Sequence, residues 1–213
     1  MSDSLDHVDI RGELTLGQGV EIDANVIIKG KVHLCDGVSV EPNCILEDAV
    51  VGEGTSIRAN SMVEGANIGQ ACIVGPYARI RPGTSIGDGA QIGNFVEIKE
   101  SDIGAGAKIN HHAFVGNATL GRDVIIGAGT ITCNYDGRRT QSMRIGDGAF
   151  IGSGCQLVAP LDIGSRAVIG AGSTVTQDAP AGRLTLARGR QVTVEGWRHP
   201  DDPDGGGQSG GDS

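Results

Sequence analysis

Aliphatic residues recur along this chain with a period of six. The series runs from Ile10 to Val175, with occasional steps of five residues such as Leu46 to Val51. A second column lies four residues after most of these anchors and holds small residues such as Cys44. Because an amphipathic helix needs apolar residues three and four apart, the pattern excludes a helical protein.

A period of six with one large aliphatic residue, one small residue and interspersed Gly is typical of short flat strands joined by tight turns, three strands to a coil. Three anchors per coil predict about nine coils, and stacking at about 4.8 Å predicts a prism on the order of 45 Å long. The pattern resembles the left-handed parallel β-helix of hexapeptide repeats, an exception to right-handed crossovers. We therefore expect this all-β fold; a right-handed β-helix, with longer and less regular coils, is the alternative.

Two segments depart from the repeat. The step from Ile126 to Ile145 is about seven residues longer than two ordinary steps, so the intervening TCNYDGRRTQSMR must contain an expelled loop. After Val175 the repeat stops, and the next residues carry more Arg than Asp and Glu. Expelled loops are frequent places for function. The predicted divisions are a β-helix domain over 9–177, a C-terminal arm over 178–200 and a disordered tail over 201–213.

Composition limits which residues can fill the core and which classes of partner the protein can bind. The 213 residues include 36 Gly, 7 Pro and only one Trp, two Tyr and three Phe, so the core must consist of aliphatic side chains with almost no rings. The net charge of −9 argues against nucleic-acid and anionic-membrane partners, which need clustered Lys and Arg. No stretch approaches the roughly 18 apolar residues of a membrane span, and the first residues are acidic. We expect a cytoplasmic protein.

Cysteine and histidine positions argue against disulfide and metal chemistry. Cys44, Cys72 and Cys155 occupy the small inward column, and an odd total of five at no metal-like spacing is most simply reduced. A catalytic zinc site needs three converging imidazoles. Only His111 and His112 lie in the central coils, and adjacent strand residues point to opposite faces. The sequence therefore predicts no metal site.

Coil arithmetic predicts the neighbours of two cations and of one histidine. Ile80 and Ile98 lie one full coil apart, which stacks Arg81 on Lys99 at about 4.8 Å. Two stacked cations repel unless an anion lies between or in front of them; the alternative is two solvated side chains. By the same arithmetic, His111 lies between Asn94 and Ala128 of the neighbouring coils, where a single His is more often structural than catalytic.

Several stretches resemble one enzyme family. GPYARIRPG, IGNFVEIK, AKINHHAFVGN, IGAGTITCNYDG, FIGSGCQLVAP and EGWRHP are similar to the C-terminal acetyltransferase half of the bifunctional N-acetylglucosamine-1-phosphate uridyltransferase/glucosamine-1-phosphate acetyltransferase family. The likeness runs from about Asp9 to Pro200, and GAGTITCNYDG is its most specific motif. No part of the sequence resembles the family's nucleotidyltransferase half, so we expect no uridyltransferase activity.

The resemblance implies a homotrimer and acetyl-CoA as co-substrate, with no metal required for acetyl transfer. It implies His111 as the base that takes a proton from the acceptor amine. Glu97 is then a candidate to contact the acceptor or to orient the imidazole. The positions that the resemblance assigns to acetyl-CoA are Ala128, Asn134, Tyr135, Ser153, Ala171 and Arg188, and each matches the family residue.

The acceptor side matches the family less well. The implied phosphate-binding pair is Arg81 and Lys99. The family's Tyr, Asn and loop Lys are replaced here by Phe114, Ile125 and Thr140. Each replacement removes a polar partner, and a hydrogen bond to a charged group contributes about 1.5–3 kcal/mol. We therefore expect weaker binding of the family's acceptor.

These observations together predict a trimeric acetyltransferase that acts on glucosamine 1-phosphate, a step in UDP-N-acetylglucosamine precursor synthesis. One alternative is an acetyltransferase for a different amino sugar, with the same base and donor site. The other is a non-catalytic trimeric paralogue that only binds or supports other molecules. Retention of His111, Asn134, Tyr135 and Arg188 argues against the second alternative, because a scaffold has no evident need for them.

Overall fold

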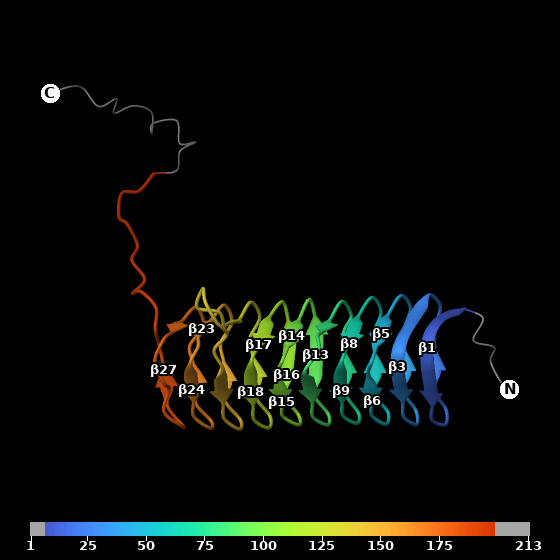
Figure 1. The fold of residues 1–213 in the computed structure, drawn as a ribbon. Coiled ribbons are helices and arrows are strands. Elements are labelled where there is room, and N and C mark those ends of the chain that lie inside the picture. Colours follow the sequence, from blue (N-terminus) through green and yellow to red (C-terminus); the bar gives the residue numbers. More distant parts are fainter. Residues whose placement is uncertain (1–6, 199–213) are drawn as a thin grey trace.

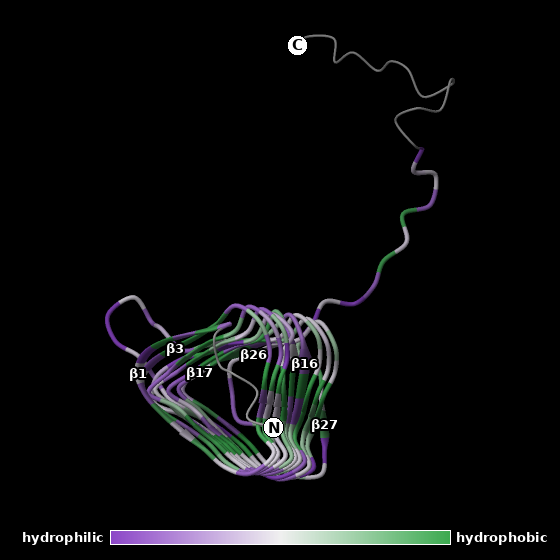
Figure 2. Ribbon diagram, turned by 90° about the vertical axis from the view of Figure 1, so that its right-hand side faces the viewer, coloured by the Kyte–Doolittle hydropathy of each residue, from purple (hydrophilic) through white to green (hydrophobic). Residues whose placement is uncertain are grey.

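The computed structural model describes residues 7–198. Within this range the regular secondary structure consists of β-strands, without helices. The chain forms a left-handed parallel β-helix, and its coils stack into a straight three-sided prism (Figure 1, Figure 2). All ladders between named strands are parallel, and neighbouring coils pair in register, as Ile92 does with Ile109. The predicted fold class is confirmed.

The three faces of the prism are named here by their strands. The ten-stranded face contains β2 (Glu21–Ile22), β4 (Ser39–Val40), β7 (Ser56–Ile57), β10 (Ile73–Val74), β13 (Gln91–Asn94), β16 (Lys108–His111), β19 (Ile125–Ile126), β22 (Phe150–Ile151), β25 (Val168–Ile169) and β27 (Leu184–Thr185). The charged face contains β5 (Ile45–Glu47), β8 (Met62–Glu64), β11 (Arg79–Ile80), β14 (Glu97–Lys99), β17 (Phe114–Gly116), β20 (Ile131–Cys133), β23 (Gln156–Val158) and β26 (Thr174–Val175). The back face contains β6 (Val50–Val51), β9 (Ala66–Ile68), β12 (Thr84–Ile86), β15 (Asp102–Ile103), β18 (Ala118–Leu120), β21 (Met143–Ile145) and β24 (Leu161–Ile163). Two longer strands, β1 (Val8–Leu16) and β3 (Val26–Leu34), cross the charged and back faces.

Both sequence columns point into the prism. Anchors such as Ile57, Ile109 and Leu157 are fully buried, and so are small-column residues such as Ala90 and Cys155. The six aromatic residues are all absent from the buried core. The predicted aliphatic core is confirmed. Most strands contribute one large aliphatic side chain to the interior of their coil, and these side chains, together with small residues, fill the interior without aromatic rings.

The two ends of the prism differ from the sequence expectation. Ile10 and Leu16 match the anchor pattern, yet each is 41% exposed, because they lie in the first coil and no preceding coil covers them. At the other end, Leu184 and Thr185 pair with Val168 and Ile169, so the ten-stranded face has ten strands where nine coils were expected. The segment predicted as an arm from residue 178 therefore follows the prism before it leaves.

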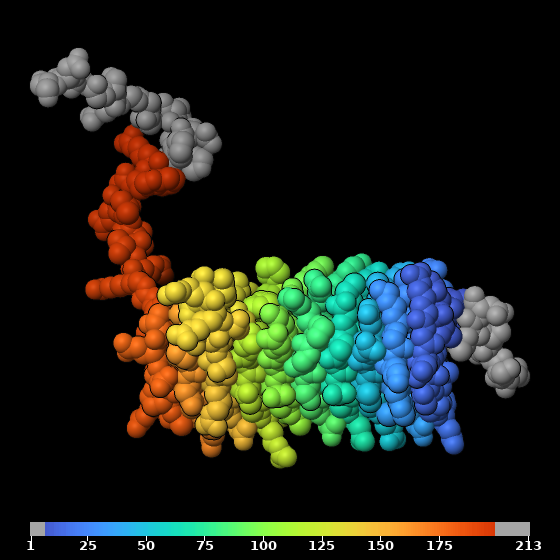
Figure 3. All heavy atoms as spheres, viewed as in Figure 1, coloured from blue at the N-terminus to red at the C-terminus, as the bar shows by residue number. Residues whose placement is uncertain are grey.

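The expelled loop and the arm project from the C-terminal half (Figure 2, Figure 3). The loop lies between β20 and β21 and is closed by an antiparallel bridge between Tyr135 and Thr140, as its sequence position predicted. The arm exposes Val192, Val194 and Trp197. The predicted disordered tail, 201–213, and the last two residues of the predicted arm lie outside the described residues.

Candidate active site

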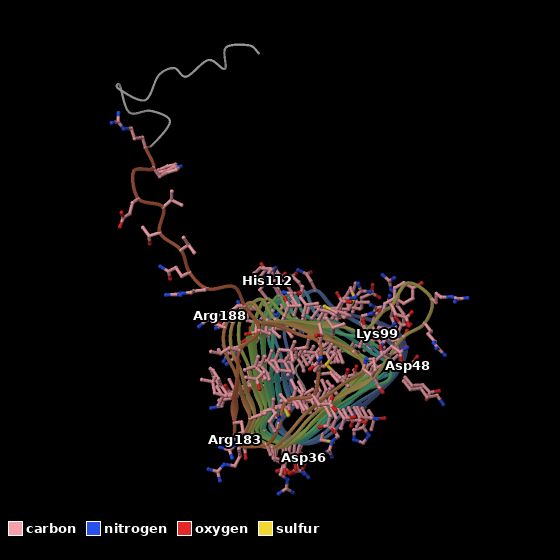
Figure 4. All side chains as sticks on the ribbon, turned by 90° about the vertical axis from the view of Figure 1, so that its left-hand side faces the viewer. Asp36, Asp48, Lys99, His112, Arg183 and Arg188 are labelled. Carbon is pink, nitrogen blue, oxygen red and sulfur yellow. The ribbon has the colours of Figure 1, made fainter. Side chains whose placement is uncertain are left out.

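Two corners of the prism carry the residues singled out by the sequence. The histidine corner joins the ten-stranded face to the charged face and carries His112 and Arg188, whereas the loop corner joins the charged face to the back face and carries Lys99 (Figure 4). The expelled loop is attached at the loop corner (Figure 2). The charged face therefore lies between both groups.

The histidine corner is a turn that requires a residue with positive φ in every coil. In chain order the residues with positive φ are Asn25, Asn43, Asn60, Tyr77, Phe95, His112, Gly129, Gly154 and Gly172. Asn and Gly tolerate this conformation, whereas it costs most other residues about 1–2 kcal/mol. Tyr77 and Phe95 stack at 5.3 Å between ring centroids, yet they remain 51% and 62% exposed. The central coils thus present exposed rings where a smaller residue would fit more easily.

The two adjacent histidines lie on either side of this corner. His111 ends β16, pairs with Asn94 in the ladder and lines a pocket of about 260 Å³ on the ten-stranded face, together with Arg58 and Gln91. His112 has φ 44° and is not part of a strand, so the strand-alternation argument does not apply to it. The histidines are separated by the turn itself.

His112 lines a second pocket, of about 210 Å³, on the charged face. Its other lining residues include Phe95, Glu97, Phe114 and Ile131. Glu97 and Phe114 are direct partners in the ladder between β14 and β17. Most of this lining is apolar, and Glu97 supplies the one carboxylate among its lining residues.

The charged face carries ion pairs beside this pocket. Arg81 Nη1 lies 2.8 Å from Glu97 Oε1, and both side chains are about one-third exposed. Arg81 N donates to Ile98 O, which places Arg81 beside Lys99, as predicted. Lys99 Nζ in turn lies 3.7 Å from Glu100 Oε1. The protein's own carboxylates therefore supply anions to both cations, and within residues 7–198 Glu97 bonds to Arg81 and to neither histidine.

The three positions predicted to differ from the family on the acceptor side do not meet in one chain. Phe114 lines the pocket on the charged face. Ile125 lies on the ten-stranded face, 39% exposed, and Thr140 lies in the expelled loop. In a single chain only the first of these is near Glu97.

The positions predicted to bind acetyl-CoA also form two groups. Ala128, Ser153 and Ala171 follow one another along the histidine corner. The backbone oxygen of each accepts a hydrogen bond from the next coil or from the arm. Gly154 N donates to Ala128 O, Gly172 N donates to Ser153 O, and Arg188 Nη1 donates to Ala171 O at 3.0 Å. Asn134 and Tyr135 lie instead in the loop, at the other corner.

Two residues that sequence reasoning missed hold the loop to its corner. Asn134 Nδ2 donates to Asn117 Oδ1, and Asn117 Nδ2 donates to Glu100 Oε2, both at 2.7 Å. Glu100 and Asn117 both have positive φ. The polar residues at turn positions that elsewhere hold Gly were the available signal in the sequence.

Asp136 organises the loop internally. Its Oδ1 accepts from the backbone N–H groups of Arg138 and Arg139, and its Oδ2 accepts from Gln141 Nε2 at 2.9 Å. The hydrogen bond from Gln141, followed by those from the two backbone groups, lowers the pKa of the Asp136 carboxyl below its ordinary value. The conformation of the loop is therefore held by its own internal hydrogen bonds.

An exposed apolar ladder runs along the C-terminal half of the ten-stranded face. Ile125, Phe150, Val168 and Leu184 pair in register on adjacent strands and are 39%, 44%, 37% and 63% exposed. Exposed apolar surfaces of this kind mark interaction sites in soluble proteins. The apolar ladder is defined here as these four residues.

Cysteine and metal chemistry can be described for residues 7–198. The five cysteines are free, as predicted, and burial raises the pKa of the Cys44, Cys72 and Cys133 thiols. In this range no three His, Cys, Asp or Glu side chains gather in a way that could hold a metal ion. The same residues include no helix of the length and apolarity needed to cross a membrane.

Comparison with known proteins finds a match to one family model and similarity to the GlmU proteins. The model of the bacterial transferase hexapeptide (six repeats) matches residues 65–100 and 142–177. The bifunctional protein GlmU of Alkalilimnicola ehrlichii is 53% identical over 195 residues, which are 92% of this chain and 42% of that protein. GlmU of Methylococcus capsulatus is 54% identical over 91% of this chain and 42% of its own length. The chain thus spans about two-fifths of the length of these relatives.

Solved structures agree on the fold. UDP-N-acetylglucosamine acyltransferase of Arabidopsis superposes with a TM-score of 0.54 at 17% identity, covering 85% of this chain and 70% of that one. UDP-N-acetylglucosamine O-acyltransferase (LpxA) of Moraxella catarrhalis gives 0.51 at 14% identity, covering 81% and 71%. At these identities the likeness concerns the β-helix alone.

Proposed function

We propose that the chain is an acetyl-CoA-dependent N-acetyltransferase of amino-sugar phosphates. The proposal is supported by the match to the bacterial transferase hexapeptide model and by the identity of about half of the residues to the matched part of the GlmU proteins. Glucosamine 1-phosphate is the leading acceptor, and the reaction would supply UDP-N-acetylglucosamine synthesis in the cytoplasm. The observation that carries the proposal is the 53% identity to a GlmU protein over 92% of the chain.

His111 is the proposed catalytic base. Its imidazole lies at the end of β16 and lines an open pocket, so an acceptor amine can approach it from solvent. A neutral imidazole can accept the proton of the acceptor ammonium. The amine then attacks the thioester carbonyl, the C–S bond breaks, and the thiolate of coenzyme A leaves.

The complete site requires more than one copy of the chain. The donor positions at the histidine corner and those in the loop are separated by the charged face. The apolar ladder and the exposed Val192, Val194 and Trp197 of the arm provide surfaces for neighbouring copies. We propose a homotrimer in which one copy's loop meets another copy's histidine corner.

The acceptor phosphate is assigned to Arg81 and Lys99. The ion pair between Arg81 and Glu97 must open or tilt for a phosphate to take its place, which lowers affinity. Thr140 cannot supply a third cation, and Phe114 cannot donate a hydrogen bond. We therefore expect glucosamine 1-phosphate to be accepted with a raised KM.

A different amino sugar is the second candidate acceptor, favoured by one observation. The pocket beside Glu97 is lined by Phe95, Phe114 and Ile131, so it suits an acceptor with a less polar face. An unphosphorylated or deoxygenated amino sugar would also leave the ion pair of Arg81 intact.

The test is a thiol-release assay with acetyl-CoA and a panel of amino sugars and amino-sugar phosphates. His111→Ala should lower kcat by about 10²–10⁴-fold and leave acetyl-CoA binding nearly unchanged. His112→Ala, the adjacent control, should do much less. Equal losses of activity in both variants would contradict the assignment of His111 as the base. Absence of thiol release with every acceptor would favour a non-catalytic protein.

The acceptor is tested by restoring the family residues. A triple variant with Phe114→Tyr, Ile125→Asn and Thr140→Lys should lower the KM for glucosamine 1-phosphate. Unchanged kinetics in that variant, together with faster turnover of an unphosphorylated amino sugar by the natural chain, would instead support the second acceptor.

A further inference from the structure

The loop corner contains a chain of polar side chains that joins the acceptor cations to the donor loop. Lys99 Nζ lies 3.7 Å from Glu100 Oε1; Asn117 Nδ2 donates to Glu100 Oε2, and Asn134 Nδ2 donates to Asn117 Oδ1. Lys99 and Glu100 are adjacent in one coil, Asn117 belongs to the next coil and Asn134 to the loop, and the two hydrogen bonds are both 2.7 Å long. The sequence assigned roles only to the two ends of this chain.

The direction of these hydrogen bonds follows from Glu100. An ionised carboxylate accepts hydrogen bonds and donates none. Asn117 must therefore turn its NH₂ group toward Glu100, which leaves its carbonyl oxygen for Asn134. Asn134 must in turn offer its NH₂ group to Asn117. The orientation of both amides is thus fixed by the network, which is the means by which such orientations are assigned.

The surrounding backbone keeps Asn134 in this position. Gln141 N donates to Asn134 O, and Met143 N donates to Asn117 O, so both ends of the loop are tied to the corner. At Gly116 a Cβ atom would lie 2.7 Å from Asn134 Nδ2 and only slightly farther from the ring of Phe114. Gly116 therefore leaves the space that this amide occupies.

From this network we propose that Glu100 is a positioning residue. Acting through Asn117, it makes Asn134 present its side-chain oxygen, Oδ1, to the acyl donor. The group of the donor bound at this point must then carry an N–H or O–H, as the amides and hydroxyl of the pantetheine arm do. This step rests on the proposed function, because it takes Asn134 as a donor-binding residue. Glu100 itself touches neither substrate in this scheme.

Reversing the charge at Glu100 tests the direction of the network. In Glu100→Lys the ammonium can only donate, so Asn117 turns its oxygen toward residue 100 and its NH₂ group toward Asn134. Asn134 then presents its NH₂ group outward, and the KM for acetyl-CoA should rise about tenfold, the loss of one net hydrogen bond.

The matched rescue is Glu100→Lys combined with Asn117→Asp. The aspartate accepts both from the ammonium and from Asn134, which restores the outward carbonyl oxygen, so the KM for acetyl-CoA should return to within about twofold of the natural chain. Asp48→Lys reverses the charge at an equivalent position of the same corner and should leave this KM unchanged. A merely structural role for Glu100 would not produce rescue by a second charge change.

A second measurement on the full chain does not depend on turnover. With ¹⁵N-labelled asparagine, the side-chain NH₂ groups of Asn117 and Asn134 should each show a proton protected from solvent exchange, and Glu100→Lys should remove the protection at Asn134. Failure of the natural chain to release thiol would defeat the proposed function only. Persistent protection at Asn134 in Glu100→Lys, or a double variant as impaired as the single one, would overturn the positioning role.

Discussion

On the ten-stranded face, the first residue of the paired strand positions is polar in the first coils and apolar in the last ones. Glu21, Ser39 and Ser56 occupy it near the N-terminus, whereas the apolar ladder occupies it from Ile125 onward. From Val40 to Ile169 the residue that follows this position is a buried Val or Ile in every coil. One backbone and one interior therefore carry two different outer surfaces.

The histidine corner shows the same contrast. Its positive-φ positions are Asn in the first coils, exposed rings at Tyr77, Phe95 and His112, and then Gly. All six aromatic residues of the chain lie from Tyr77 onward. A repeat constrains the inward positions of every coil alike, so the outward positions are free to differ where a site is built.

The largest effect is expected from breaking the apolar ladder. Phe150→Asp places a charge at its second position, and we expect the assembly to dissociate and turnover to be lost, because in the proposed trimer the site is shared between copies. Sedimentation should give a mass near one chain of 21.8 kDa instead of three. Ser39→Asp, at the equivalent position of an N-terminal coil, should leave the trimer intact. A natural chain that already sediments as a monomer would contradict the proposed assembly.

Cavities in the core should show that the interiors of the two regions are equivalent. Ile57 and Ile109 are both fully buried on the ten-stranded face. Ile57→Ala and Ile109→Ala should each lower the free energy of unfolding by about 2–5 kcal/mol, through lost burial and the cavity left behind. Chemical denaturation measures both. A marked difference between them would mean that the interior, too, differs along the prism.

Relief of backbone strain separates the two regions by a smaller amount. His112→Gly should raise the free energy of unfolding by about 1 kcal/mol, because Gly adopts positive φ without steric cost. Asn60→Gly should change it little, since Asn already tolerates this conformation. Thermal or chemical unfolding of both variants gives the comparison. A loss of stability in His112→Gly would show that this side chain contributes packing that outweighs the strain.

The smallest effect is expected in the loop. Asp136→Asn weakens the hydrogen bonds from Arg138, Arg139 and Gln141, so trypsin should cleave after the two arginines faster, as measured by mass spectrometry of the fragments.

The pH dependence of the loop follows from the lowered pKa of Asp136. A carboxyl whose pKa is lower in the folded state stabilises it fully above the unfolded value, and this contribution is lost as the pH falls through the folded value. Cleavage of the natural loop, corrected for the pH dependence of the protease, should therefore be constant from pH 5 to 8. Faster loop cleavage at pH 5 than at pH 8 would contradict this assignment.

Much of the site could be expected from the sequence, with limits that have physical causes. The stacking of Arg81 on Lys99 follows from coil length alone, because a ladder in register repeats its spacing. The pairing of Arg81 with Glu97 does not follow from it, since it depends on side-chain rotamers across the ladder. His111 and His112 were expected on opposite sides of a strand, but a turn separates them because His112 has positive φ.

The sequence by itself determined the interior of this protein: the period, the inward columns, the expelled loop and the absence of rings from the core. These follow from local spacing, because each coil buries its anchors against identical neighbours. Only the tertiary structure decided which polar groups meet across a corner, as Glu100, Asn117 and Asn134 do. Such contacts join residues about one coil apart through turns and a loop, where the direction of a side chain depends on φ and on hydrogen bonds that the repeat does not specify.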